Sequence, residues 1–306
     1  MAAAAAQAPT YPVRPVRIVV PAAAGGALDL IARLLAPQVG HLWKQPVVVE
    51  NRPGANFIIG MEAVANSAPD GYTLLEVASA GVTINPYVFP NMTIDPLRQL
   101  TPVVITSVGN FVLMVNKDLP VHSVKELVNL VKANPGKYSH GSNSASTILV
   151  SELFKSIANL DYIDVNYRGA SEAILATQSG ITQFCFADAG SAVAALKGGT
   201  LRAIALTSPD RSNLLPDIPT FVEQGINLIA STDTLLMAPG QTPPAVIDQI
   251  DAGFQKALHT PEVTAAIERL ANQVGGTSQQ AARQLLLGEA QQWQKLIKDR
   301  NIKFGH

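Results

Sequence analysis

Short apolar runs alternate along the chain with longer segments in which apolar residues recur near the helical period. The short runs are rich in β-branched residues and are bounded by turn residues, as is typical of buried strands. They lie at residues 17–20, 47–50, 73–78, 103–106, 112–116, 184–187, 202–207 and 235–238. Residues 28–43 give the clearest helical pattern. Strands alternating with helices predict an α/β fold with mostly parallel sheets that are covered on both faces.

Capping residues mark where several helices begin. Ser123, with a glutamate three residues on, forms a capping-box pattern. Thr242 and Thr260 each precede a proline directly, which predicts two further N-caps. Ser278 is expected to cap a last helix over residues 279–298, whose apolar side should pack on a core.

Composition places the chain among globular proteins. It has 306 residues, of which 47% are apolar and 15% charged, so it can bury sizeable cores and form two domains. Its formal net charge is -1, and the basic residues form no run that could follow a phosphate backbone, which argues against nucleic-acid binding. The apolar runs are far shorter than the ~20 residues that a membrane-spanning helix needs. We expect no such helix.

The N-terminus and the single cysteine bear on the compartment. The alanine-rich start, residues 1–8, is similar to the small-residue end of a signal peptide, so we expect an exported protein whose leader is missing here. An unrelated alanine-rich tail is the alternative. Cys185 is the only cysteine, so no intrachain disulfide forms, and its apolar strand predicts an inert core residue.

Two loops of small residues at strand exits are the candidate ligand sites. Ligands of open α/β sheets bind outside the carboxyl ends of the strands. The loop over residues 21–27 contains Gly25 and Gly26, and its backbone N–H groups at a helix start suit an anion such as a carboxylate. It lacks the dinucleotide and Walker A patterns. A tight turn without a ligand remains the alternative.

The second loop, residues 141–147, is dense in hydroxyl groups and also precedes a helix. We expect two α/β lobes with one such loop on each. The loops would face each other across a cleft for a small ligand with polar groups at both ends, held by backbone amides, hydroxyls and water. Asp188 also follows a strand, where its side chain could accept a hydrogen bond from the ligand or cap the next helix. Arg168 could pair with a ligand carboxylate or support the fold through an ion pair.

No reactive constellation accompanies these loops. The nearest approach to a nucleophile elbow, Gly169 to Ala173, lacks the second glycine. The five histidines show no metal-ligand spacing, and His140 alone stands where a catalytic role is conceivable. No paired carboxylates of a glycosidase can be identified. We therefore expect a binding protein without catalytic residues, metal or cofactor.

Several motifs occur together in a set order. They include Val49-Glu50-Asn51-Arg52-Pro53-Gly54-Ala55, Ala68-Pro69-Asp70-Gly71-Tyr72-Thr73, Ala133-Asn134-Pro135-Gly136-Lys137, Leu215-Pro216-Asp217-Ile218-Pro219-Thr220 and Ala238-Pro239. This pattern resembles the substrate-binding receptors of tripartite tricarboxylate transporters, the Bug or TctC-like family, over nearly the whole chain. The resemblance implies a type II periplasmic-binding-protein fold, a periplasmic location, and delivery of a small carboxylate or related polar solute to a membrane permease pair.

The resemblance also assigns site roles. The loop over residues 23–26 would hold a carboxylate, and the loop over residues 142–147 and Asp188 would set specificity. With their neighbours, the expected ligand-binding residues are Ala23, Ala24, Gly25, Gly26, Asp29, Ser79, Ser142, Asn143, Ser146, Thr147, Arg168, Gly169, Ala187 and Asp188.

The chain also departs from the family's usual pattern, which favours an atypical ligand. The unusual positions are Ala22, Ala27, Asn56-Phe57-Ile58-Ile59, Ser144, Ser146, Asn166, and the stretch from Ser231 to Thr234, which lacks a frequent tryptophan. Dicarboxylates, tricarboxylates, amino acids, aromatic acids and amides all remain open as ligands.

The expected organisation is a monomer of two lobes. The chain should cross from the first lobe to the second near Gly109 and return to the first lobe near Ser231. The expected parts are a residual leader or tail (1–10), a first lobe (11–109 plus 231–306) and a second lobe (110–230). Two other functions are left open: a sensor that presents its closed form to a membrane signalling protein, and an enzyme acting on a small acid through His140 or Asp188.

Overall fold

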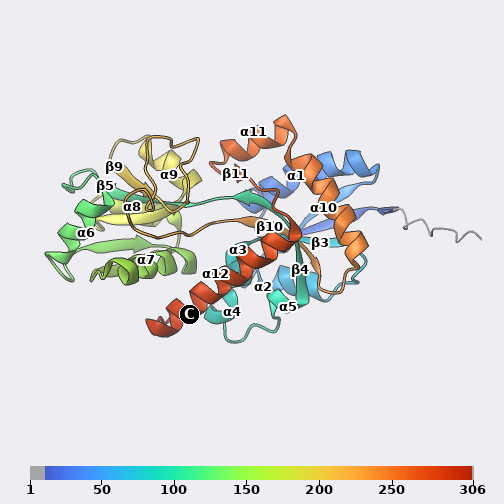
Figure 1. Cartoon of the computed structure of the whole chain (residues 1–306), viewed down its shortest axis with the longest axis horizontal. Helices are drawn as coiled ribbons and strands as arrows, with labels where there is room; N and C mark the ends of the chain where they lie inside the picture. The colour runs from blue at the N-terminus through green and yellow to red at the C-terminus, as the bar shows by residue number, and fades with distance from the viewer. Residues whose placement is uncertain (1–10, 305–306) are drawn as a thin grey trace, which may run out of the picture.

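The computed structural model describes residues 11–304, so the expected leader remnant lies outside the described residues. Two sheets, each with helices on both faces, lie side by side and are joined by extended segments (Figure 1). The first has the order β11-β4-β10-β3-β1-β2, with β1 (Val16–Val20), β2 (Val47–Asn51), β3 (Thr73–Ala78), β4 (Leu100–Val108), β10 (Thr234–Pro239) and β11 (Gln273–Val274). The second has the order β7-β6-β8-β5-β9, with β5 (Phe111–Asn116), β6 (Ser139–Ser142), β7 (Ile163–Asn166), β8 (Phe184–Asp188) and β9 (Leu201–Leu206).

The helices divide between the two sheets. Those beside the first sheet are α1 (Ala27–Trp43), α2 (Ile58–Ala65), α3 (Ser79–Thr83), α4 (Asn85–Val88), α5 (Pro96–Gln99), α10 (Pro244–Leu258), α11 (Pro261–Arg269) and α12 (Gln279–Asp299). Those beside the second are α6 (Val124–Lys132), α7 (Ala145–Ala158), α8 (Ala170–Gln178) and α9 (Ala189–Leu196). Within residues 11–304, no helix has both the length and the apolar character needed to cross a membrane.

The expectation of mostly parallel sheets is wrong, because both sheets are mixed. Strand β10 runs antiparallel to β3 and β4, and β5 runs antiparallel to β8 and β9, whereas β1 and β6 pair in parallel with their neighbours. Parallel pairing requires a long crossover connection. The chain instead passes directly from β4 in one sheet to β5 in the other, and β10 re-enters the first sheet from the second.

Most of the expected helix caps are confirmed. The hydroxyls of Ser123, Thr260 and Ser278 each accept a hydrogen bond from the N–H three residues on. Thr242 is the exception, since Pro243 is the N-cap of α10 and the Thr242 hydroxyl donates to the Pro239 carbonyl (2.8 Å). That hydroxyl therefore stabilises the turn after β10 instead of the helix.

The two chain crossings lie against each other between the sheets. Asn110, just after β4, forms an isolated antiparallel bridge with Ser231, just before β10. A Cβ on Gly109 would stand 2.1 Å from the Thr232 hydroxyl oxygen, so a larger residue here would force Thr232 to shift.

Helix α12 also joins the two sheets. Its first half places Ala282 and Leu286 in the core of the first sheet, while Trp293 and Leu296 pack into the core of the second. In Figure 1 it runs from the first sheet toward the second. Apolar burial thus holds the two halves together at a point away from the crossings.

Replacing Trp293 with alanine should destabilise the chain by about 3–5 kcal/mol, because a large side chain that is 4% exposed leaves a cavity. Unfolding in urea, followed by circular dichroism, measures this. Leu285→Ala on the exposed side of the same helix is the control, with an expected cost below about 1 kcal/mol. Equal losses in the two variants would contradict the bridging role of α12.

Candidate functional site

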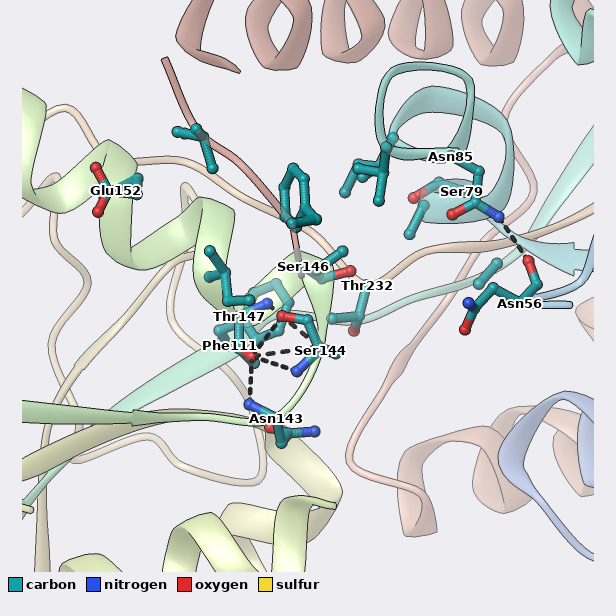
Figure 2. A pocket seen from close by; sticks show the side chains of 18 of the residues that line it. Asn56, Ser79, Asn85, Phe111, Asn143, Ser144, Ser146, Thr147, Glu152 and Thr232 are labelled. Carbon is teal, nitrogen blue, oxygen red and sulfur yellow. Dashed lines mark hydrogen bonds between the residues drawn. The ribbon is translucent and has the colours of Figure 1, made fainter. Parts of the chain in front are cut away.

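A cavity of about 1020 Å³ lies between the two sheets. Its walls come from the residues that follow β3, from the loop before α7, from the crossing segment at residues 231–233 and from the C-terminal segment at residues 302–304. Figure 2 shows Ser79, Asn85 and Asn56 on one side of the cavity and the loop that begins at Asn143 on another. A space of this size accepts a small organic molecule.

The second sheet contributes the N-terminus of α7 to the cavity wall. Ser144 is the N-cap and forms a capping box with Thr147, whose hydroxyl oxygen also accepts the N–H of Asn143 at 3.0 Å. The N–H groups of Ala145 and Ser146 precede the first possible helical acceptor, and the helix dipole adds positive potential there. The Ser146 hydroxyl has no hydrogen-bond partner among the described residues. This turn of α7 can therefore bind an anion.

The wall from the first sheet combines amide groups with apolar side chains. The Asn85 side-chain amide donates to the Asn56 carbonyl oxygen at 2.6 Å, which ties α4 to the loop before α2. Phe57, Ile84 and Val88 face the same cavity. Phe111 and Phe304 add apolar surface from the second sheet and the C-terminal segment. The cavity thus offers a polar end and a broad apolar wall.

Three acidic side chains lie near the crossings, where burial raises their pKa values. Glu76 is fully buried and its pKa rises to about 8; the hydrogen bond with Thr106 leaves its Oε2 atom unpartnered. The pKa of Asp233 rises to about 6 and that of Glu289 to about 7, also mainly through burial. Glu289 accepts hydrogen bonds from the hydroxyls of Ser231 (2.8 Å) and Thr83 (3.3 Å).

Five of the sequence-predicted site residues lie on the cavity wall. They are Ser79, Asn143, Ser146, Thr147 and Asp188. Asp188 also caps α9, since its Oδ1 accepts the Ser191 N–H at 2.9 Å. The two alternatives for Asp188 are therefore compatible.

The first predicted loop lies outside this cavity. Ala23, Ala24, Gly25 and Gly26 are exposed and do not form part of its wall. Asp29 is buried beneath them, where it accepts hydrogen bonds from the Gly25 N–H (2.8 Å), Arg33 and Asn51. The Arg33 hydrogen bond is the main reason that the Asp29 pKa falls to about 2. Asp29 thus fixes the loop, and the role of the loop in binding stays a prediction.

The remaining predicted residues belong to the body of the second sheet. Ser142 and Ala187 are buried, and the Ser142 hydroxyl bonds to the Asn166 side chain. Arg168 is exposed, its backbone N–H donates to Glu172 at 3.2 Å, and neither it nor Gly169 contributes to the cavity wall. A ligand contact at these positions also stays a prediction.

His140 has a structural environment. It is fully buried, and its Nε2 accepts the Phe186 N–H at 3.1 Å, so Nδ1 carries the proton and donates to Asp164 at 2.8 Å. Burial would raise the pKa of Asp164, but the hydrogen bonds from His140 and Lys155 hold it below its ordinary value. Both ring nitrogens are engaged, which leaves His140 no route to a substrate.

Several cavity residues were missed when the site was read from the sequence. They include Asn56, Phe57, Asn166, Thr232 and Asp233. Each is at a position, or within a stretch, that departs from the family's usual pattern, so these departures were the available signal. The C-terminal residues Ile302 and Phe304 gave no such signal, because only the fold brings them to the cavity.

The comparisons with known proteins agree on one family. A family model described as the tripartite tricarboxylate transporter family receptor, TctC, matches residues 31–302. The protein BugT of Bordetella pertussis is 32% identical over 306 residues, and the match covers 98% of this chain and 94% of that protein.

Solved structures agree as well. A Rhodopseudomonas palustris protein with adipate is 28% identical with a TM-score of 0.79, and the match covers 96% of this chain and 99% of that chain. The protein MatC of Rhodopseudomonas palustris with bound malate is 26% identical with a TM-score of 0.75, covering 94% and 100%. The expected periplasmic-binding-protein fold is thereby confirmed.

Stability should fall as the pH rises from about 5 to 8. The folded chain keeps a proton on Glu76 up to about pH 8, whereas the unfolded chain loses it near pH 4.5, so the stability that this proton gives the folded state is lost across this window. We expect Glu76→Gln to flatten the slope by up to ~1.4 kcal/mol per pH unit. Urea unfolding at several pH values measures this.

The control for this experiment is Glu268→Gln, which changes an exposed carboxyl on α11. It should keep the slope of the unchanged chain. A Glu76→Gln variant with that same slope would show that the buried carboxyl does not hold its proton.

Proposed function

Since the chain belongs to the receptor family of tripartite tricarboxylate transporters, we propose that it captures a small carboxylate in the cavity between its sheets and delivers it to the permease of such a transporter. Members of this family are solute-binding receptors and not enzymes. The observation that carries the proposal is the N-terminus of α7 on the cavity wall. Its unpaired N–H groups and the Ser146 hydroxyl provide donors for a carboxylate.

The apolar side chains on the same wall suit the carbon skeleton of the solute. The two solved relatives hold adipate and malate, which supports a carboxylate joined to a short carbon chain as the starting probe. Among residues 11–304, Arg300 is the one arginine that lines the cavity, and its guanidinium is bonded to Glu152 at 3.1 Å. The head group would therefore be held by N–H groups and hydroxyls rather than by an arginine clamp.

Capture would involve closure of two lobes, 11–109 plus 231–306 and 110–230, about the crossings. In the closed form, the exposed loop at Gly25 and Gly26 would approach the loop at Ser142 and complete the binding surface. The chain would act as a periplasmic monomer.

A calorimetric and thermal-shift screen tests the function. The chain is refolded to remove carried-over solute and then titrated with adipate, malate and other aliphatic and aromatic acids. A solute at about a hundred times its Kd should add ~2.7 kcal/mol of stability. No binding by any acid to the folded chain would overturn the proposal.

Ser146→Ala should weaken binding of the best acid by about fivefold to tenfold, which corresponds to one lost net hydrogen bond of ~1 kcal/mol. Its stability should be unchanged, because the Ser146 hydroxyl bonds to no described residue. Ser144→Ala is the matched comparison and should lose about 1 kcal/mol of stability with the N-cap. Isothermal titration and urea unfolding separate the two effects. Unchanged affinity in Ser146→Ala would remove this hydroxyl from the site.

Gly26→Leu should abolish binding while the fold is retained. Gly26 has an extended backbone, and a Cβ there would meet only the Ala23 carbonyl oxygen at an ordinary 3.6 Å. The added side chain would stand where the first loop has to approach the second lobe. Calorimetry measures the affinity and circular dichroism the fold. Gly288→Leu, in open space on α12, is the control. Wild-type affinity in Gly26→Leu would exclude the first loop from the binding surface.

A further inference from the structure

Asp233 combines burial with an unpartnered acceptor at the cavity. Its residue surface is only 2% exposed, it forms part of the cavity wall, and its Oδ1 atom has no hydrogen-bond partner among the described residues. Its backbone is fixed, because its carbonyl oxygen accepts the Ser79 N–H at 2.8 Å. A buried acceptor without a partner is unfavourable in a folded protein unless something else satisfies it.

The described groups packed around Asp233 provide no positive charge. Glu289 of α12 faces it and is itself an acid, while Ser231, whose hydroxyl donates to Glu289, and the Gly109 N–H of the crossings are neutral groups. Ser79 at the start of α3 is neutral as well. Asp233 on the cavity wall and Glu289, which is not part of that wall, thus lie together without a paired cation among the described residues.

The basic residues of the cavity wall are at its C-terminal segment. Arg300 is paired with Glu152, and Lys303 is exposed with no ion pair among the described residues. The other acids of the wall are accounted for, since Asp164 pairs with Lys155 and Asp188 caps α9. Asp233 is therefore the acidic wall residue that retains an unused acceptor.

A comparison within the chain shows what a structural aspartate looks like here. Asp29 is just as buried, but Arg33, Asn51 and the Gly25 N–H satisfy both of its oxygens. Its pKa is lowered to about 2, whereas that of Asp233 is raised to about 6. The fold thus supplies hydrogen-bond donors to both oxygens of Asp29, and it leaves Oδ1 of Asp233 without a donor at the cavity.

We infer that Asp233 binds a protonated amino group of the solute, so that the preferred solute carries an ammonium group as well as a carboxylate. The inference rests on the proposed function, in which the carboxylate end is held at the N-terminus of α7. Asp233 would then select among small acids, because an ammonium group completes its hydrogen bonding and balances the two acids, while a second carboxylate would meet them with like charge.

The test uses matched pairs of acids that differ by one amino group, glutamate against glutarate and aspartate against succinate. The full chain, refolded free of solute, is titrated by calorimetry at pH 5, 6.5 and 8. We expect the amino compound of a pair to bind at least tenfold more tightly at pH 8, and its advantage to shrink at pH 5 as Asp233 becomes protonated. Binding at pH 6 should release part of a proton, measured in buffers of different ionisation enthalpy.

Asp233→Asn should reduce the affinity for the amino compound by about tenfold to a hundredfold and remove the proton release, while the affinity for the plain acid is retained or increased. Glu76→Gln changes a buried carboxyl away from the cavity wall, so it should alter neither the affinity for the amino compound nor the proton release. Circular dichroism checks that both variants fold. If Asp233→Asn does not fold, two measurements on the unchanged chain still test the inference. They are the proton release and the preference for the amino compound over the plain acid of each pair.

Three results would overturn the inference: plain acids that bind as tightly as their amino partners, proton uptake on binding of the amino compound, or an Asp233→Asn variant with unchanged affinity and proton release. Each of these requires that some acid binds, so the proposed function would survive them. If no acid of either kind binds the folded chain, the proposed function fails together with the inference.

Discussion

The cavity depends on the close contact between the two chain crossings. Gly109 lies so near Thr232 that a Cβ at position 109 would displace the Thr232 hydroxyl, and Asn110 pairs with Ser231 in an isolated β-bridge. Asp233, which follows Thr232, accepts a hydrogen bond at its carbonyl oxygen from the N–H of Ser79, the first residue of α3. The atoms that fix the position of one sheet relative to the other therefore lie next to the cavity wall. Movement of one sheet relative to the other would change the site directly.

Apolar packing by α12 complements the crossings. Trp293 and Leu296 lie in the core of the second sheet, although the helix begins beside the first. Arg300 beyond its end pairs with Glu152, but a partly exposed ion pair of this kind contributes little to stability. Burial of apolar surface is thus the larger contribution of α12, and the same packing brings Ile302 and Phe304 to the cavity.

The polar groups of the first sheet show how stability and binding are divided. Asp29 is fully hydrogen-bonded and fixes the loop after β1, whereas Glu76 and Asp233 are buried with an oxygen that lacks a partner. Burying incompletely bonded carboxyls costs stability, and the cost rises as the pH ionises them. Asp233 carries this cost at the wall of the cavity, where a solute can offset it.

The sequence by itself determined the strand and helix pattern, the caps at Ser123, Thr260 and Ser278, and the family resemblance, because periodicity, capping and motifs are local properties. It also singled out the loop over residues 142–147, of which all but Ser142 line the cavity. Tertiary structure decided the mixed strand directions, the internal role of Asp29, and the meeting of Asp233, Glu289 and Phe304 near one cavity. These features depend on contacts between residues far apart in the chain. Strand direction follows from how the chain crosses between sheets, and a buried carboxylate's role follows from which distant donors reach it.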